Sequence, residues 1–362
     1  MKRKLKVFAF KLIRVIGRFF YRRRIWLIND RAMLAGDNGE AFFRFLSNKD
    51  VDAVFAIKRK SPDYERVKKY GEVVEYESLK HKFLSSVCDC HIGSITIHMD
   101  DHEEAPQIFL QHGVIFSDCS SYLNPASHDK FYILTSAEKE KNGLCTGRYT
   151  IKNDNIWLTG LPRFDYLNDN SKKKIVIIFS WRTDIPLLTR EEVLNSLYVR
   201  TILRIFDDER INRVLKDAGY ELYIKLHPEV QILESILPER IKNRIYRESF
   251  NKLYEEASLL ITDYSSAISD FVYLNKPVLY YHFDNGEYYN GPFKAKGDYD
   301  YEKDGFGPVT YSFDDFANEL EKIINNHCIM EKKYKDRVDK FFAYHDRNNC
   351  ERVYQNIKRL IG

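Results

Sequence analysis

The stretch Leu259–Asp284 constrains the fold of this chain more than any other part of the sequence. It opens with a short apolar run, Leu259–Thr262, and contains a second one, Val278–His282; each run is typical of a buried strand. Polar and helix-forming residues lie between them, up to a Lys-Pro pair that ends a helix. Strand, helix and strand in this order predict a βαβ unit of a parallel sheet. Such sheets bind their ligands at the carboxyl ends of the strands.

Three polar residues follow the first of these strands: Asp263, Ser265 and Ser266. We expect one of the serines to start a helix that continues to about Asn275, with hydroxyls and free N–H groups that suit an anion. Serine is also a very common helix cap, so a purely structural role fits the same residues equally well. The spacing alone does not separate the two interpretations.

Apolar and helical segments alternate through most of the chain. This alternation predicts two doubly wound α/β domains, residues 25–168 and 174–345, each with a parallel sheet, and a ligand between them. The polar run Asn168–Lys174 predicts a linker, and residues 346–362 predict a C-terminal helix. Besides the two strands above, we expect strands at Ile25–Asn29, Val51–Ile57, Val73–Tyr76, Ile92–Ile97, Ile108–Leu110, Phe131–Thr135, Ile156–Thr159, Ile175–Phe179, Glu221–Leu226 and Arg244–Arg247.

Positive charge is concentrated at the amino terminus. Residues 1–24 hold ten of the 57 Lys and Arg and no acidic residue, which leaves 47 basic against 53 acidic residues elsewhere. A mildly acidic body argues against nucleic-acid binding. Apolar residues fall on one helical face of the segment and basic residues on the other, which predicts a helix lying in the surface of an anionic membrane. A solvated basic helix packed on its own domain would show the same pattern.

The six cysteines form no C-x-x-C pair and no zinc-ligand spacing, which predicts free thiols in a reducing compartment, the cytoplasm. The chain has no Walker phosphate loop, no G-x-G-x-x-G turn after the first strand and no G-x-S-x-G elbow. These absences disfavour P-loop kinases, nicotinamide dehydrogenases and α/β-hydrolases. We expect no metal site and no cofactor.

Several polar residues come directly after predicted strands, among them His112, Arg182 and His227. In a parallel sheet these positions open onto one edge, so they could converge on one site together with Asp263 and the two serines. Histidine can transfer protons near neutral pH, although a single histidine is more often structural.

A set of motifs occurs in order over roughly residues 25–355: I-W-L-I-N-D-R with A-G-D-N-G-E, Q-H-G, G-L-P-R-F-D, S-W-R, K-L-H-P, I-T-D-Y-S-S, K-P-V-L-Y-Y-H-F-D and D-Y-E-K-D-G-F-G-P-V. Together they resemble the CDP-glycerol glycerophosphotransferases, the teichoic-acid primases and polymerases of Gram-positive bacteria. The resemblance implies a GT-B-like pair of Rossmann-like domains, with the acceptor on the first and the CDP-polyol donor on the second. It also implies transfer of glycerol phosphate or ribitol phosphate to a hydroxyl of an undecaprenyl-linked polymer, with release of CMP, at the cytoplasmic face of the membrane. An association of identical chains is compatible with it.

Carried over by motif, the resemblance makes His112 the general base that deprotonates the acceptor hydroxyl and His227 the residue that binds or protonates the donor phosphates. Phosphoryl transfer needs positioned cations and N–H donors more than covalent machinery. The expected donor-binding residues are Arg182, Lys225, Thr262, Asp263, Ser265 and Ser266. The expected acceptor-binding residues are Arg31, Asp37 and Asn38.

Two other functions fit the sequence. A GT-B glycosyltransferase or sugar-phosphate transferase of capsule synthesis would use another nucleotide-activated donor, and a donor screen would identify it. A degenerate family member could act without catalysis as a membrane-bound assembly partner, but the presence of both His112 and His227 argues against it.

Overall fold

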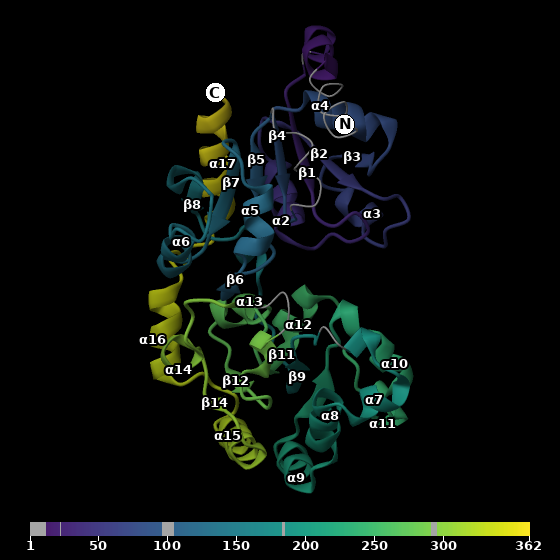
Figure 1. Cartoon of the computed structure of the whole chain (residues 1–362), viewed down its shortest axis with the longest axis vertical. Coiled ribbons are helices and arrows are strands. Elements are labelled where there is room, and N and C mark those ends of the chain that lie inside the picture. Colours follow the sequence, from purple (N-terminus) through teal and green to yellow (C-terminus); the bar gives the residue numbers. More distant parts are fainter. Residues whose placement is uncertain (1–11, 22, 96–104, 183–184, 291–294) are drawn as a thin grey trace. The chain divides into compact units, whose positions relative to one another are not determined.

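The computed structural model describes residues 12–21, 23–95, 105–182, 185–290 and 295–362 (Figure 1). The chain divides into two compact units. The first unit comprises the described residues up to Val114, then Ser120–Tyr166 and Phe342–Gly362. The second comprises Ile115–Cys119 and Leu167–Phe341.

The first unit is built on a seven-stranded parallel sheet with the order β3-β2-β1-β4-β5-β7-β8. The order runs outward in both directions from the neighbours β1 and β4, which is the reversal that defines a doubly wound sheet. Its strands are β1 (Ile25–Asn29), β2 (Asp52–Ile57), β3 (Glu72–Glu75), β4 (Cys90–Gly93), β5 (Gln107–Phe109), β7 (Phe131–Thr135) and β8 (Ile156–Leu158). Its helices are α2 (Asn38–Leu46), α3 (Tyr64–Val67), α4 (Leu79–Val87), α5 (Ser120–Ala126), α6 (Glu138–Leu144) and α17 (Asn349–Ile361).

The second unit is built on a five-stranded parallel sheet with the order β10-β9-β11-β12-β14. Its strands are β9 (Lys174–Ile178), β10 (Glu221–Ile224), β11 (Ala257–Thr262), β12 (Val278–Tyr281) and β14 (Val309–Thr310), and β13 (Ala295–Lys296) pairs antiparallel with β6 (Ser117–Asp118). Its helices are α7 (Arg190–Asn195), α8 (Leu197–Asp207), α9 (Glu209–Ala218), α10 (Ile232–Ile236), α11 (Glu239–Lys242), α12 (Phe250–Glu256), α13 (Ile268–Tyr273), α14 (Tyr301–Asp304), α15 (Phe313–Asn325) and α16 (Lys332–Phe341).

The central strands of both sheets are mostly apolar and buried because helices cover both faces. Ile175, Ile177, Leu259 and Ile261 of β9 and β11 are fully buried in one core with residues of α8, α9 and α15. The predicted α/β class with two parallel sheets is confirmed.

Two local predictions are wrong. Arg244–Arg247 is not a strand: only a single bridge joins Ile245 to Ile224. The helix after Ser265 and Ser266 begins only at Ile268, and neither serine is its N-cap. Residues 265–267 instead form a turn, in which the hydroxyl of Ser265 accepts the N–H of Ala267 at 3.3 Å.

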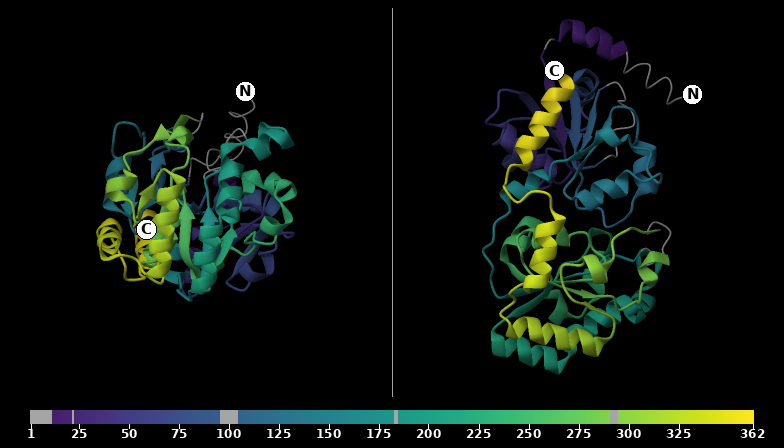
Figure 2. Two further views of the ribbon diagram at one scale, coloured as in Figure 1. Left: turned by 90° about the horizontal axis from the view of Figure 1, so that it is seen from below. Right: turned by 90° about the vertical axis from the view of Figure 1, so that its left-hand side faces the viewer.

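The C-terminal helix α17 packs on the first unit (Figure 2). Its start is held by the carboxylate of Asp165, which accepts the N–H groups of Asn349 at 3.0 Å and Cys350 at 2.8 Å. Gly160 permits this approach: its φ is 75°, and a Cβ there would lie 1.8 Å from Oδ1 of Asn349. The last helix of the chain thereby becomes part of the first unit, next to α2.

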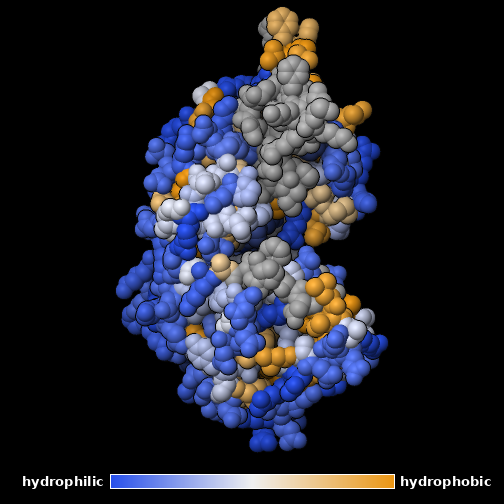
Figure 3. Space-filling model, viewed as in Figure 1, coloured by the Kyte–Doolittle hydropathy of each residue, from blue (hydrophilic) through white to orange (hydrophobic). Residues whose placement is uncertain are grey.

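Residues 12–20 form a helix that is fixed to the first unit by two arginines. Arg14 donates to the carbonyls of Ser86 at 3.2 Å and Cys88 at 3.0 Å, and Arg18 pairs with Asp89 at 2.5 Å. Its apolar side chains instead face solvent and colour the top of Figure 3 orange; they are Leu12, Ile13, Val15, Ile16, Phe19 and Phe20.

The predicted membrane-surface helix over residues 1–24 stays a prediction, because residues 1–11 and 22 lie outside the described part. No helix in the described part is long and apolar enough to cross a membrane.

Candidate active site

A buried carboxylate organises the carboxyl edge of the first sheet. Asp30 directly follows β1 and accepts the N–H groups of Asp37 at 3.1 Å, Gly39 at 2.9 Å and Glu40 at 3.1 Å, and the hydroxyl of Ser94 at 2.5 Å. Burial and the charge of Asp37 raise the pKa of Asp30 to about 7, while these hydrogen bonds act in the opposite direction. The N–H groups at the start of α2 are thus occupied by the protein's own carboxylate.

Asp30 can approach α2 because Gly39 has no side chain. A Cβ on Gly39 would lie 2.4 Å from Oδ1 of Asp30 and 2.8 Å from the carbonyl oxygen of Asn29. Glycine is therefore required at this position of the A-G-D-N-G-E motif, where backbone and carboxylate meet.

Asn38 connects α2 to the segment that carries His112. Its side chain is fully buried, donates to the carbonyl of Gln111 at 2.9 Å and accepts the N–H of Arg163 at 3.0 Å. Gln111 has a φ of 60° and donates its amide to Glu140 at 3.1 Å, so its own side chain turns inward. The next residue, His112, is exposed.

Arg163 of the G-L-P-R-F-D motif fixes the backbone of His112. Its guanidinium donates to the carbonyl of His112 at 2.9 Å and forms an ion pair with Asp37. Asp37 is also the N-cap of α2 and accepts the N–H of Asn38. One network therefore links Asp30, the start of α2, Arg163 and the histidine loop.

The imidazole of His112 is poised to be neutral. It is accessible at the surface, yet reduced hydration among surrounding protein atoms lowers its pKa, and the charges of Arg163 and Arg31 act in the same direction. Asp37 and a hydrogen bond to the backbone of Ser94 act in the opposite direction. A neutral imidazole can accept a proton, which general-base catalysis requires.

The second unit holds a buried cluster of charges at the carboxyl ends of β9, β11 and β12. Asp263 is fully buried and accepts the N–H groups of Ser180 at 2.7 Å and Tyr264 at 2.6 Å. Arg182 pairs with Asp263 at 2.9 Å and with Asp284 at 2.7 Å. Arg182 and Asp263, which the sequence places far apart, are thus in direct contact.

Aromatic rings cover this cluster. Tyr264 donates its hydroxyl to Asp284 at 2.8 Å, and its ring stacks on those of His282 at 4.2 Å and Tyr288 at 4.6 Å between centroids. Burial and the hydrogen bond to Asp284 raise the pKa of Tyr264 above its usual range, so the phenol stays protonated as a donor. Burial also lowers the pKa of His282.

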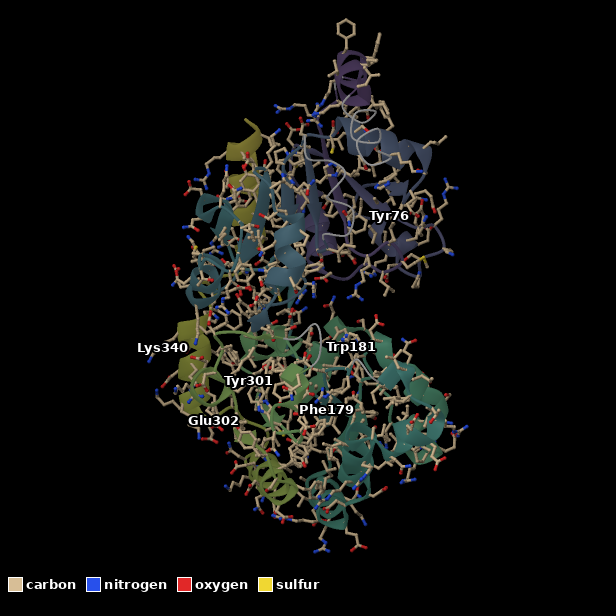
Figure 4. The ribbon with its side chains drawn as sticks, viewed as in Figure 1. Tyr76, Phe179, Trp181, Tyr301, Glu302 and Lys340 are labelled. Carbon is tan, nitrogen blue, oxygen red and sulfur yellow. The ribbon has the colours of Figure 1, made fainter. Side chains whose placement is uncertain are left out.

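His227 lies on the segment after β10 and stacks on Trp181, with ring centroids 5.9 Å apart and planes inclined by 16°. Trp181, labelled in Figure 4, comes from the segment after β9. Nδ1 of His227 accepts the N–H of Glu229 at 3.2 Å, which fixes the orientation of the ring.

The other predicted donor contacts point in different directions. Thr262 is buried and donates to the carbonyl of Ile178 at 2.9 Å, and Lys225 donates to the carbonyl of Glu248 at 2.6 Å. Burial lowers the pKa of Lys225. Ser265 and Ser266 are partly exposed in their turn. On the first unit, Asp37 is partly exposed and Arg31 is exposed.

Sequence reasoning missed four organising residues: Asp30, Ser94, Arg163 and Asp284. Asp30, Arg163 and Asp284 lie inside motifs that carried the family resemblance, but nothing in the spacing indicated their partners. Among the described residues, no group of three or more His, Cys, Asp or Glu could hold a metal ion.

Comparison with known proteins identifies the family of this chain. The family model described as CDP-glycerol:poly(glycerophosphate) glycerophosphotransferase matches residues 10–359. The chain belongs to this glycerophosphotransferase family. The match includes both histidine motifs and both charge networks.

Proteins similar to this chain include the minor teichoic acid biosynthesis protein GgaB of Bacillus subtilis (strain 168). It is 32 % identical over 381 aligned positions, which cover 98 % of this chain and 42 % of that protein. The teichoic acid poly(ribitol-phosphate) polymerase of Bacillus spizizenii is 27 % identical over 64 % of this chain and 39 % of its own length. The chain thus spans less than half the length of these two relatives.

A solved structure of the wall teichoic acid polymerase TagF superposes with a TM-score of 0.69 at 15 % identity, covering 99 % of this chain and 98 % of that one. At this identity the likeness concerns the fold, which is GT-B-like with two Rossmann-like units.

Proposed function

We propose that this chain transfers glycerol phosphate or ribitol phosphate from a CDP-activated donor to a hydroxyl of a teichoic-acid acceptor and releases CMP. The observation that carries the proposal is the family match over residues 10–359, which contains the presented His112 and its supporting network. The relatives named above, a teichoic acid biosynthesis protein and a poly(ribitol-phosphate) polymerase, support the same class of product.

The reaction needs one base and a leaving group. The acceptor hydroxyl oxygen forms a bond to the polyol-linked phosphorus, while the bond from that phosphorus to the bridging pyrophosphate oxygen breaks and CMP departs. The neutral imidazole of His112 accepts the proton of the acceptor hydroxyl. His227 binds or protonates the phosphate of the departing CMP. The lowered pKa of His112 supports its role as base at neutral pH.

The two ligands belong to different units in this proposal. The acceptor binds residues 25–168, near Arg31 and Asp37, and the CDP donor binds residues 174–345, near His227, Ser265 and Ser266. The occupation of the α2 N–H groups by Asp30 supports this division, since those groups are not free for the donor phosphates.

The acceptor in this proposal is an undecaprenyl-linked polymer, and the enzyme works at the cytoplasmic face of the membrane, alone or as a homo-oligomer. The helix at residues 12–20 supports a peripheral attachment, because Val15, Phe19 and Phe20 are 73 %, 74 % and 79 % exposed. Its arginines Arg14 and Arg18 face the protein, so apolar insertion contributes more than these two charges do.

The transfer reaction is tested by CMP release from CDP-glycerol and CDP-ribitol with a lipid-linked acceptor mixture. We expect acceptor-dependent CMP from one donor, reduced roughly 100-fold or more in His112→Ala. The matched control is His345→Ala, since His345 is exposed on the first unit and its ring packs against that of Phe342. Turnover of UDP- or GDP-sugars in place of both CDP-polyols would overturn the proposal and favour a glycosyltransferase.

Membrane attachment is tested by sedimentation with phosphatidylglycerol vesicles. We expect the triple variant Val15→Ser, Phe19→Ser, Phe20→Ser to stay in the supernatant while the wild type sediments. Leu187→Ser is the control, because Leu187 is 85 % exposed but lies on the second unit. Equal sedimentation of the triple variant and the wild type would refute the attachment.

A further inference from the structure

Arg182 donates three of its five guanidinium N–H groups to the protein. Its side chain is 14 % exposed, and Nη1 donates to Asp263 at 2.9 Å and to the carbonyl of Ser180 at 2.7 Å. Nη2 donates to Asp284 at 2.7 Å. Two carboxylates share one cation, so the cluster carries a net negative charge.

Aromatic side chains cover the faces of the same guanidinium. Its central carbon lies 5.0 Å from the ring centroid of Tyr288, 5.1 Å from that of Phe283 and 5.6 Å from that of Tyr198. A phosphate that paired with Nη1 of Arg182 would have to displace Asp263 or the carbonyl of Ser180 from a largely buried site. A cluster with net negative charge also disfavours an anion beside it.

The carboxylates that Arg182 pairs with hold the loops around the candidate donor site. Asp263 accepts the N–H of Ser180, which precedes Trp181, and the N–H of Tyr264, which precedes Ser265. Asp284 accepts the hydroxyl of Tyr264 and, at 3.2 Å, the N–H of Gly286. One arginine thus connects the segments after β9, β11 and β12.

We propose that Arg182 is a positioning residue and makes no contact with the donor phosphates. It keeps Asp263 and Asp284 in place. These carboxylates hold Ser180 and Trp181 after β9, and the turn at Ser265 and Ser266, in the geometry that binds the donor. The inference rests on the proposed function, because it assigns the donor to this edge of the second sheet. It differs from the family-based expectation that Arg182 itself holds the pyrophosphate.

Donor affinity distinguishes the two roles. The experiment measures CDP-glycerol and CDP-ribitol binding to the full chain by calorimetry for the wild type, Arg182→Met, Asp263→Asn and the double variant. A positioning role predicts that each single variant weakens binding roughly 10- to 100-fold, and that the double variant is no weaker than the worse single variant. A direct phosphate ligand predicts weaker binding in Arg182→Met only, because removing the Asp263 charge would leave anion binding equal or stronger.

Two more variants complete the design. Arg182→Lys keeps the charge but cannot span both carboxylates, so positioning predicts the behaviour of Arg182→Met, whereas near-wild-type affinity would overturn the proposal. Arg240→Met is the matched control, because Arg240 pairs with Asp207 at 2.7 Å on the exposed surface of the same unit. We expect unchanged donor affinity in this control.

A readout without donor separates this inference from the proposed function. Tyr198, Tyr264 and Tyr288 surround Arg182, so their near-ultraviolet circular dichroism reports the cluster in the folded protein. If the wild type binds neither CDP-polyol, the proposed function fails. The positioning of Asp263 by Arg182 then still stands if Arg182→Met and Asp263→Asn cause the same, non-additive spectral loss, and is overturned if the losses add.

Discussion

Both units place a fully buried aspartate at the end of a central strand, but they balance its charge differently. Asp30 follows β1 and is 1 % exposed, while Asp263 follows β11 and is 0 % exposed. Asp30 accepts four hydrogen bonds and has no ion pair among the described residues. Asp263 accepts two backbone N–H groups and pairs with Arg182.

The difference indicates what each carboxylate does. A buried anion without a cation is costly unless all its oxygens accept hydrogen bonds, so Asp30 depends on the N–H groups of α2 and they depend on it. In many Rossmann-like domains the N–H groups at this turn bind phosphate, but in the first unit Asp30 already accepts them. Asp263 instead joins segments of three strands through Arg182, and the Ser265–Ser266 turn beside it remains partly exposed.

Asp30→Asn should cause the largest loss. The amide nitrogen would face donors in place of one carboxylate oxygen, and two of the four hydrogen bonds would lose their acceptor. We expect the free energy of unfolding to fall by about 4 kcal/mol. Urea denaturation measures this, with Asp339→Asn as a control because Asp339 pairs with Lys335 on the surface of α16. A loss no greater than that of the control would show that Asp30 is not the anchor of α2.

Asp263→Asn should cost less than Asp30→Asn. The amide oxygen can still accept the N–H groups of Ser180 and Tyr264, which both bond to one carboxylate oxygen. Only the contact with Arg182 becomes unfavourable, and Arg182 keeps Asp284. We expect the free energy of unfolding to fall by about 2 kcal/mol in urea denaturation. A loss equal to that of Asp30→Asn would remove the distinction between the two carboxylates.

Much of this architecture follows from local sequence. The apolar runs at Ile25–Asn29, Phe131–Thr135 and Leu259–Thr262 predict strands that the structure confirms, because a run of four to six apolar residues between polar turns has few other uses in a parallel sheet. The polar edge after the strands was likewise predictable, since side chains that follow parallel strands share one edge. The contact between Arg182 and Asp263 agrees with that reasoning.

What the sequence could not provide is the direction of each side chain at that edge. Thr262 ends β11 and Lys225 follows β10, yet their side chains turn to the backbone of Ile178 and Glu248. Arg163 supports His112 from 51 positions away in the sequence, and no local pattern encodes such a pairing. Arg244–Arg247 resembled a strand, but only Ile245 reaches the sheet.

At the opposite end of β11, the buried carboxylate of Glu256 is paired with two cations, Lys172 and Lys174. Hydrogen bonds from Lys172 and Lys174 lower the pKa of Glu256 from 4.5 to about 2. A lowered pKa means that Glu256 stabilises the fold above pH 4.5 and loses this effect as the pH falls toward 2. We expect Glu256→Gln to lower the free energy of unfolding by about 1–2 kcal/mol at pH 7, allowing for screening of the exposed lysines.

Urea denaturation of the wild type and Glu256→Gln at several pH values measures this contribution. The difference between them should shrink steadily below pH 4.5. A difference that stays constant down to pH 3 would mean that the lysine pairs contribute nothing that depends on the charge of Glu256.

The smallest effect concerns His112, whose charge surroundings differ from those of both aspartates. Its pKa is lowered from 6.5, chiefly by reduced hydration among the surrounding protein atoms and also by Arg163 and Arg31. The acid limb of the pH–rate profile should therefore lie below pH 6.5, because the base acts in its neutral form. Removing the Arg31 charge in Arg31→Gln removes one repulsion of the imidazolium, so the limb should move up toward 6.5.

Asp37→Asn should move the same limb in the other direction, since the Asp37 carboxylate favours the protonated imidazole. The opposite signs of the two shifts identify a titrating group that lies close to both Arg31 and Asp37, as His112 does. An acid limb that stays fixed in both variants would assign the base to a group other than His112.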